Sequence, residues 1–146
     1  MPILSSLRFD TTIIQNEIDV FQISSYFTAT PKSHSVPSTQ IPFDVLLDHN
    51  SGINNPEPGI VTIMDEGIYY FSVNVQRSAS ANTQISITHN EKRVCIAHNC
   101  DGASNHYMMT CSASIKAAKG DKVSVTLDSG SIDGFGSFVG FLTSLE

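Results

Sequence analysis

The feature that most constrains this chain is an alternation of period two in residues 67–76. Tyr69, Phe71, Val73 and Val75 occupy every second position, and polar side chains fill most of the positions between them. Successive residues of a strand point to opposite faces, so the pattern predicts a half-buried antiparallel strand. Shorter runs with the same period stand at 43–47, 85–87 and 123–127.

Residues that favour turns separate these runs. They stand at 56–59, 89–92, 119–122 and 133–136, where Gly, Pro, Asn and Asp tolerate positive φ or preset a turn. Short strands at regular spacing, with no room for helical crossovers, predict an all-β sandwich or barrel. The 146 residues suffice for one domain with one core.

The first 25 residues follow a different pattern. Residues with a 4-3 spacing form one seam, which consists of Leu4, Leu7, Thr11, Ile14, Ile18 and Phe21. Such a seam predicts a short coiled coil. An ordinary amphipathic segment and a β-strand remain alternatives, because several residues here are β-branched. We therefore expect a lead-in over residues 1–25, helical or extended, before a globular domain over residues 26–146.

Charge and hydropathy exclude several classes of function. The net charge is -6, and the 8 Lys and Arg residues form no basic patch, which argues against nucleic acid as a partner. The apolar runs are too short for membrane insertion. No motif surrounds a candidate nucleophile together with His and Asp, so the sequence does not predict an enzyme.

Three cysteines, Cys95, Cys100 and Cys111, lie close together. Their spacing departs from the paired pattern of zinc sites, although His98 and His106 could complete a ligand set. One disulfide with a remaining thiol, or three buried thiols, are the simpler interpretations.

Seven landmarks along the chain, taken in order, resemble the globular heads of complement C1q within the C1q and tumour necrosis factor superfamily. They are Tyr26–Ala29, Ile41–Asp44 with the loop at 49–52, Gly59–Val61, Gly67–Phe71, His89–Asn90, Lys119–Val123 and Ser137–Leu142. The resemblance implies a ten-stranded jelly-roll sandwich. It also implies that Tyr69, Phe71, Phe138 and Phe141 face inward, and that Gly140 permits a close approach.

The resemblance further implies a homotrimer that recognises ligands outside the cell. We expect a secreted innate-immune protein that binds glycans or microbial surface patterns, sialic acid-type sugars among them. The alternative is a trimeric signalling ligand that binds a protein receptor through grooves between subunits. No signal peptide is visible at Met1, so a cytosolic protein and a processed secreted one both fit the sequence; the resemblance favours the second.

The candidate ligand-binding loop is dense in hydrogen-bonding groups beside one aromatic ring. Its residues are His98, Asn99, Asp101, Ser104, Asn105, His106 and Tyr107. Polar groups next to an aromatic side chain suit sugars, which present hydroxyls and an apolar face. Arg77, beside the polar segment 78–83, is a candidate partner for an acidic sugar. A solvated loop and a solvated strand end are the simpler interpretations.

The same loop resembles the one that holds calcium in complement C1q chains. By position, Asp101 is the candidate metal ligand, while the downstream oxygen ligand of the family falls at Met108, a thioether. We therefore expect either no cofactor or calcium. Cys100 stands where complement chains have a disulfide partner, and it could pair with Cys95 or Cys111.

Overall fold

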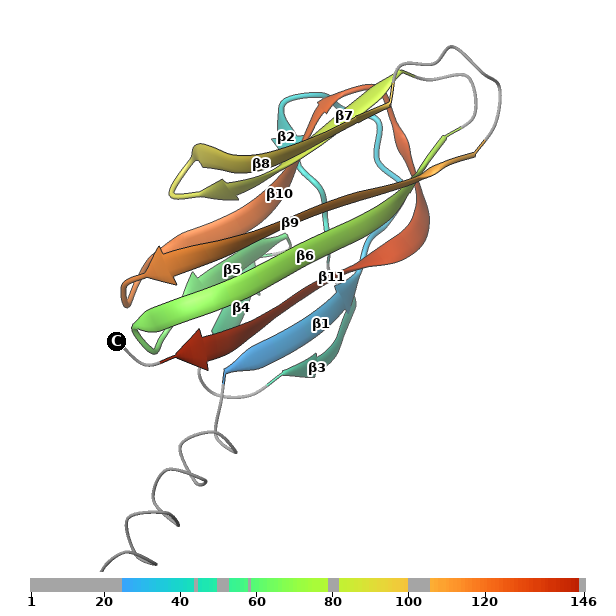
Figure 1. Cartoon of the computed structure of the whole chain (residues 1–146). Helices are drawn as coiled ribbons and strands as arrows, with labels where there is room; N and C mark the ends of the chain where they lie inside the picture. The colour runs from blue at the N-terminus through green and yellow to red at the C-terminus, as the bar shows by residue number, and fades with distance from the viewer. Residues whose placement is uncertain are drawn as a thin grey trace, which may run out of the picture.

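The computed structural model describes residues 25–43, 45–49, 53–57, 59–78, 82–99 and 106–144. Within these ranges every element is a β-strand, and the strands form two sheets (Figure 1). The predicted coiled-coil seam lies in residues 1–24, outside the described ranges. The prediction of an all-β jelly-roll sandwich is confirmed.

The first sheet has five antiparallel strands. Their spatial order is β3 (Val45–His49), β1 (Tyr26–Thr30), β11 (Ile132–Ser144), β6 (Gly67–Arg77) and β9 (Met108–Ala117). Strands from both ends of the sequence lie side by side here, because β1 pairs with β11. This interleaving of distant segments is characteristic of jelly rolls.

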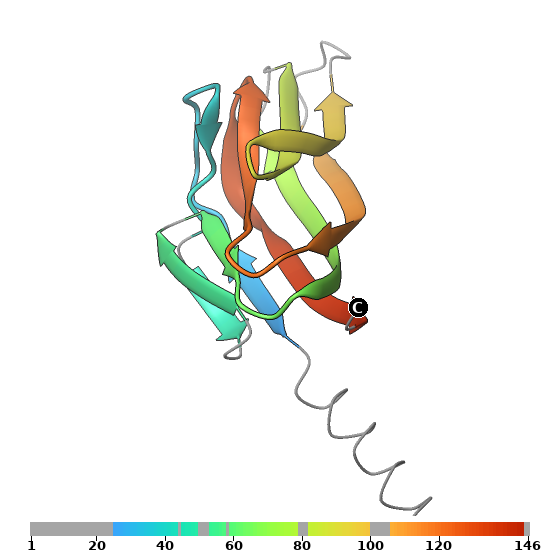
Figure 2. The same cartoon turned by 90° about the vertical axis from the view of Figure 1, so that its left-hand side faces the viewer.

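The second sheet has six strands. Its continuous order is β4 (Ile53–Glu57), β5 (Ile60–Ile63), β10 (Lys122–Ser129), β7 (Thr83–His89) and β8 (Lys92–Asn99), and the short β2 (Thr39–Gln40) pairs with β10. Figure 2 shows the molecule turned by 90°, with β2, β4 and β5 on the left and β9 of the first sheet on the right. The two continuous orders hold the ten expected strands, and β2 is an addition to them.

The inward face of β6 agrees with the predicted alternation. Tyr69, Phe71, Val73 and Val75 are all 0% exposed. Apolar side chains of the opposite sheet belong to the same core, among them Ile85, Ile87, Val123, Val125 and Leu127. Burial of this apolar area is the main driving force for joining the sheets.

Aromatic rings fill the centre of the core around Gly140. The rings of Phe27 and Phe138 meet edge to face at 4.9 Å, and those of Phe27 and Phe71 are 6.1 Å apart. A Cβ atom on Gly140 would lie 2.5 Å from Phe27 Cε1 and 2.6 Å from Phe71 Cδ1. The expected close approach at Gly140 is therefore an approach by core rings.

One of the four predicted inward aromatics is wrong. Phe141 is 44% exposed and contacts the ring of Tyr70 on the outer face of the first sheet. Phe138 and Leu142 are buried. The period of two along β11 therefore gives Phe141 the opposite face.

Three of the four predicted turns connect strands. At the β7–β8 hairpin, Asn90 and Glu91 have φ of 50° and 69°, so Glu91 adopts the left-handed conformation that glycine favours. The fourth prediction is wrong, since residues 133–136 lie within β11. The pairing of β11 with β6 is irregular between Ile132 and Gly136, which forms a bulge.

A disulfide joins the two sheets along one edge. It links Cys95 on β8 to Cys111 on β9, the last strands in the orders of their sheets. The Cα atoms are 6.1 Å apart, within the usual range. Of the pairings left open by the sequence, this one leaves neither Cys95 nor Cys111 for a bond to Cys100, which itself lies outside the described ranges.

None of the residues that the structure describes belongs to a helix long and apolar enough to span a lipid bilayer.

Candidate functional site

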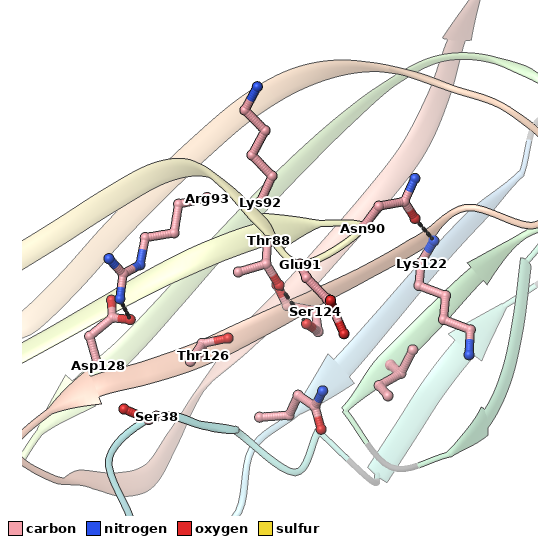
Figure 3. A pocket seen from close by; sticks show the side chains of 12 residues that line it. Ser38, Thr88, Asn90, Glu91, Lys92, Arg93, Lys122, Ser124, Thr126 and Asp128 are labelled. Atoms are coloured by element: carbon pink, nitrogen blue, oxygen red, sulfur yellow. Dashed lines mark hydrogen bonds and ion pairs between the residues drawn. The ribbon is translucent and has the colours of Figure 1, made fainter.

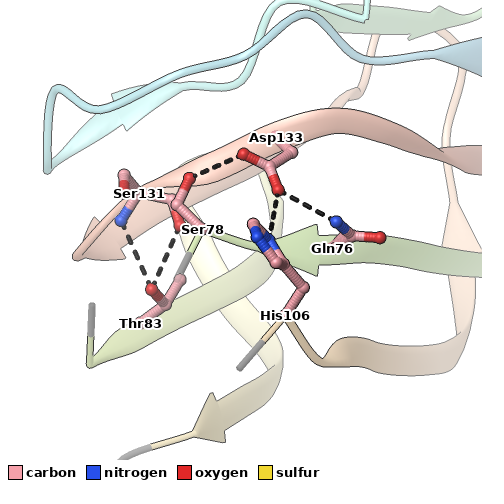
Figure 4. Close-up of polar contacts among 6 residues, drawn as sticks. All are labelled: Gln76, Ser78, Thr83, His106, Ser131 and Asp133. Carbon is pink, nitrogen blue, oxygen red and sulfur yellow. Dashed lines mark hydrogen bonds and ion pairs between the residues drawn. The ribbon is translucent and has the colours of Figure 1, made fainter. Parts of the chain in front are cut away.

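A polar cluster stands at the end of the sandwich where β6 finishes and β11 begins (Figure 4). Asp133 is at its centre. Gln76 Nε2 donates to Asp133 Oδ2 at 3.0 Å, Ser78 Oγ donates to Oδ1 at 3.0 Å, and His106 Nδ1 lies 2.8 Å from Oδ2. Three segments far apart in the sequence therefore meet at one carboxylate.

The surroundings of Asp133 favour its ionised form. Desolvation alone would raise the pKa of this carboxyl, but the hydrogen bonds from Gln76, Ser78 and His106 outweigh it. The net effect lowers the pKa below its ordinary value. Asp133 is therefore a fixed acceptor at neutral pH that orients three side chains, among them the exposed His106.

A second pair of hydrogen bonds supports the cluster from the side of β7. Thr83 Oγ1 donates to the Ser131 carbonyl at 3.2 Å, and the Ser131 N–H lies 3.3 Å from the same hydroxyl (Figure 4). Gly130, just before Ser131, has a φ of 79°, and a Cβ there would lie 2.3 Å from the Asn82 carbonyl oxygen. The start of β7 and the entry to β11 thus approach closely.

Arg77, the predicted partner of an acidic sugar, is inside the protein. Its side chain is 0% exposed, and Nη1 donates to Asn99 Oδ1 at 3.1 Å. Its guanidinium carbon lies 5.1 Å from the centroid of the Tyr107 ring. Both interpretations that placed Arg77 at the surface are therefore wrong. Arg77 follows Val75 on the inward face of β6 and binds side chains on both sides of segment 100–105.

The structure places four of the remaining predicted loop residues near this end. Asn99 ends β8, His106 and Tyr107 precede β9, and His98 is exposed on β8 opposite Gln84. His106 and Tyr107 reach different partners, since His106 joins Asp133 and Tyr107 joins Arg77. Asp101, Ser104 and Asn105 lie outside the described residues.

The sequence singled out Ser78 and Thr83 as part of the polar segment 78–83, but it gave no indication of Gln76 and Asp133. Alternation along β6 places Gln76 on the outward face, and Asp133 stood in a segment predicted to be a turn. No local signal connects them, because Gln76 and Asp133 are 57 positions apart. The pairing of β11 with β6 brings them together.

The cluster does not have the geometry of a catalytic triad. In a triad, the His accepts the proton of the nucleophilic hydroxyl and the Asp orients the His. Here the Ser78 hydroxyl donates to the Asp133 carboxylate, and His106 contacts that same carboxylate. The arrangement fixes donors and acceptors at the surface, which suits binding of a polar ligand.

The set of calcium ligands implied by the C1q resemblance fits the described residues poorly. Met108 stands on β9 where an oxygen ligand is implied, and its thioether is a poor donor to a hard cation. Within the described ranges there is no group of three or more His, Cys, Asp or Glu side chains that could hold a metal.

Comparison with known proteins agrees with this architecture. Residues 26–143 match the family model of the C1q domain. The globular domain of zebrafish complement 1qA superposes with a TM-score of 0.70 at 16% identity, covering 84% of this chain and 98% of that one. A search of curated proteins gives no significant match.

Two further solved structures share the fold. Murine APRIL superposes with a TM-score of 0.61 at 16% identity, covering 82% of this chain and 98% of that one. Rabbit GITRL superposes with a TM-score of 0.60 at 11% identity, covering 84% and 96%. At these identities, the likeness concerns the fold alone.

Proposed function

Because the chain belongs to the C1q domain family, we propose that it is a secreted, non-catalytic recognition protein that acts as a homotrimer. Its proposed ligands are glycans or other patterns on microbial surfaces, with sialic acid-type sugars as the acidic class. Two surfaces support this proposal: an aromatic face suited to assembly, and the polar cluster at the end of the sandwich.

The observation that supports assembly is a row of aromatic side chains on the outer face of the first sheet. Tyr26, Phe141 and Tyr70 are in register across β1, β11 and β6, and this aromatic row is defined by these three residues. Tyr26 is 38% exposed and Phe141 is 44% exposed. Neighbouring aromatic rings at a surface are typical of the centre of a protein interface.

The same face becomes polar along the strands. Asn74 stands opposite Ser137 and Thr110, and Thr110 Oγ1 donates to Asn74 Oδ1 at 3.2 Å. Beyond Asn74, the strand leads to Gln76 and the Asp133 cluster. A trimer built on the aromatic row would therefore leave the polar cluster toward one end, where ligands could reach it.

Light scattering on matched variants tests the assembly. We expect the wild-type protein at micromolar concentration to have about three times the 15.8 kDa chain mass. Phe141→Ser should give folded monomers, because it removes the centre of the aromatic row. Phe135→Ser is the control, since Phe135 is 67% exposed on the same strand but outside the row. A wild-type monomer, or equal behaviour of both variants, would contradict this assembly.

A glycan array tests the ligand class. We expect the wild-type protein to bind acidic glycans, and His106→Ala to weaken that binding while trimer mass and thermal stability stay constant. Absence of binding by the wild-type protein to every glycan on the array would contradict glycan recognition and favour the signalling-ligand alternative.

The same array, run with and without a chelator, tests whether calcium takes part in binding. We expect a calcium-dependent protein to lose binding when the chelator is added. If Asp101→Asn retains the same response to the chelator as the wild-type protein, Asp101 is excluded as a calcium ligand.

A further inference from the structure

A groove on the outer face of the second sheet lies apart from the Asp133 cluster (Figure 3). Strand β10 forms its floor, the β7–β8 hairpin forms one wall, and residues 38–40 form the other. Its volume is about 910 Å³. This is within the range of small-molecule sites and has room for more than one sugar ring.

Hydrogen bonds hold both walls against the floor. The Lys122 N–H donates to Asn90 Oδ1 at 2.9 Å, and the Asn90 N–H donates to the Lys122 carbonyl at 2.8 Å. On the other side, Gln40 pairs with Thr126, and the Ile41 N–H donates to the Val125 carbonyl at 2.8 Å. The groove is therefore largely preformed, which lowers the entropy cost of binding.

The floor presents hydroxyl groups. Val123, Val125 and Leu127 point into the core, so alternation turns Ser124 and Thr126 toward the groove. The hydroxyls of Ser124 and Thr88 are 2.6 Å apart, and the two residues are only 7% and 8% exposed, so Thr126 is the accessible hydroxyl residue of the floor. Hydroxyl groups both donate and accept hydrogen bonds, as the hydroxyls of a sugar do.

Three of the eight Lys and Arg residues of this acidic chain line the groove. Arg93 is bound to Asp128, with Nη2 2.7 Å from Oδ1. Among the residues that the structure describes, Lys92 and Lys122 have no ion-pair partner. Glu91 is the remaining acidic residue of the lining.

The balance of these charges indicates how many anionic groups the ligand has. Three positive and two negative side chains leave a local charge of +1, whereas the whole chain has -6. A polyanion would be repelled by the rest of the molecule, whereas a single anionic group could bind one ammonium group. Figure 3 shows the Lys92 and Lys122 side chains pointing away from each other, so the groove offers these ammonium groups at two separate positions. None of the described residues that line the groove is aromatic, so hydrogen bonds and charge, rather than ring stacking, would hold the ligand.

We propose that this groove binds an oligosaccharide bearing a single anionic group, with Lys92 or Lys122 contacting the anion and Thr126 contacting the sugar hydroxyls. This inference rests on the proposed function for the ligand being a glycan. It adds a second site, which shares no residue with the Asp133 cluster.

Calorimetric titration with defined sugars tests the inference. The probes are sialyllactose, which has a carboxylate, lactose sulfated at one position, neutral lactose and a heparin tetrasaccharide. We expect one or both singly anionic sugars to bind at least about tenfold more tightly than lactose and heparin, since charge-assisted hydrogen bonds distinguish them. Tighter binding of heparin would overturn the single-anion assignment.

Matched variants locate the site. Lys92→Ala or Lys122→Ala, whichever removes the ammonium group that contacts the anion, should weaken binding of the anionic sugar by about five- to tenfold. Lys119→Ala, an exposed lysine outside the groove, should change it less than about twofold. Glu91→Gln should tighten binding by a few-fold through loss of repulsion, a gain that misfolding does not mimic.

The outcomes separate this inference from the proposed function. If the wild-type protein binds acidic sugars but Lys92→Ala and Lys122→Ala bind equally well, the groove assignment is overturned and glycan recognition stands. If the wild-type protein binds no glycan on the array, the proposed function fails and the groove assignment fails with it.

Discussion

The guanidinium carbon of Arg77 lies 5.1 Å from the centroid of the Tyr107 ring, inside the protein. Arg77 Nη1 also donates to Asn99 Oδ1, and the backbone N–H of Arg77 donates to the Tyr107 carbonyl at 2.8 Å. Asn99 ends β8 and Tyr107 precedes β9. One buried cation therefore fixes both ends of the segment that contains the predicted ligand loop.

Replacement of this cation should destabilise the whole domain. We expect Arg77→Met to lower the free energy of unfolding by roughly 2–4 kcal/mol, through loss of a buried charge-assisted hydrogen bond and a cation–π contact. Arg93→Met is the control. Its side chain is 54% exposed in the ion pair with Asp128, so its loss should cost less than about 1 kcal/mol. Urea denaturation measures both, and equal small losses would contradict a structural role for Arg77.

The disulfide between Cys95 and Cys111 should contribute measurably to stability. It closes a loop with a sequence separation of 16. We expect Cys95→Ser with Cys111→Ser, or reduction, to lower the free energy of unfolding by about 3 kcal/mol. Cys100→Ser should leave it unchanged. Non-reducing peptide mapping is the direct check, and a peptide containing Cys100 linked to Cys95 or Cys111 would exclude the pairing described here.

Periodicity predicted the fold, and strand parity would also have placed Arg77 and Phe141 on the correct faces. Tyr69 to Val75 alternate inward on β6, and Arg77 continues the same parity, which gives a buried position. On β11, Phe138 and Phe141 differ by three positions, so they face opposite sides. The general expectation that arginine is exposed and phenylalanine is buried prevailed over strand parity in both cases.

Contacts between distant strands could not be predicted in this way. Asp133 meets Gln76 because β11 pairs with β6, and Lys92 and Lys122 line the same groove because the β7–β8 hairpin is bound to β10. Glycine and aspartate at 133–136 favour a turn and a bulge equally, and only strand pairing distinguishes them. The same holds for the cysteines, whose pairing follows from the edge positions of β8 and β9.

Gly140 should tolerate no larger side chain. A Cβ atom there would lie within 2.6 Å of two rings, Phe27 and Phe71, which are 2% and 0% exposed and cannot move aside. We expect Gly140→Ala to cost about 1–3 kcal/mol in thermal or urea unfolding. The control is Gly134→Ala on the same strand, where the nearest atom would be 3.6 Å away. Equal stability of the two variants would mean that the core can expand around position 140.

Stability should fall in acid because of Asp121. The Asn90 side chain, the Ala118 N–H and His89 donate hydrogen bonds that lower its pKa from 3.8 to about 2, against a smaller desolvation effect. His89 Nε2 lies 2.7 Å from Oδ2. A carboxyl whose pKa is lower in the folded state contributes stability above its unfolded pKa, and this contribution is lost as the pH falls toward the folded value.

The expected window therefore lies between about pH 4 and pH 2, with a contribution of roughly 2 kcal/mol at neutral pH. Asp121→Asn should remove this contribution and flatten the pH dependence in that window. Glu66→Gln, which alters an exposed carboxyl, should retain the wild-type slope. Urea denaturation at pH 6, 4, 3 and 2 measures the slope, to which Asp133 adds with the same sign because its pKa is also lowered. An unchanged slope in Asp121→Asn would assign the acid sensitivity to other carboxyl groups.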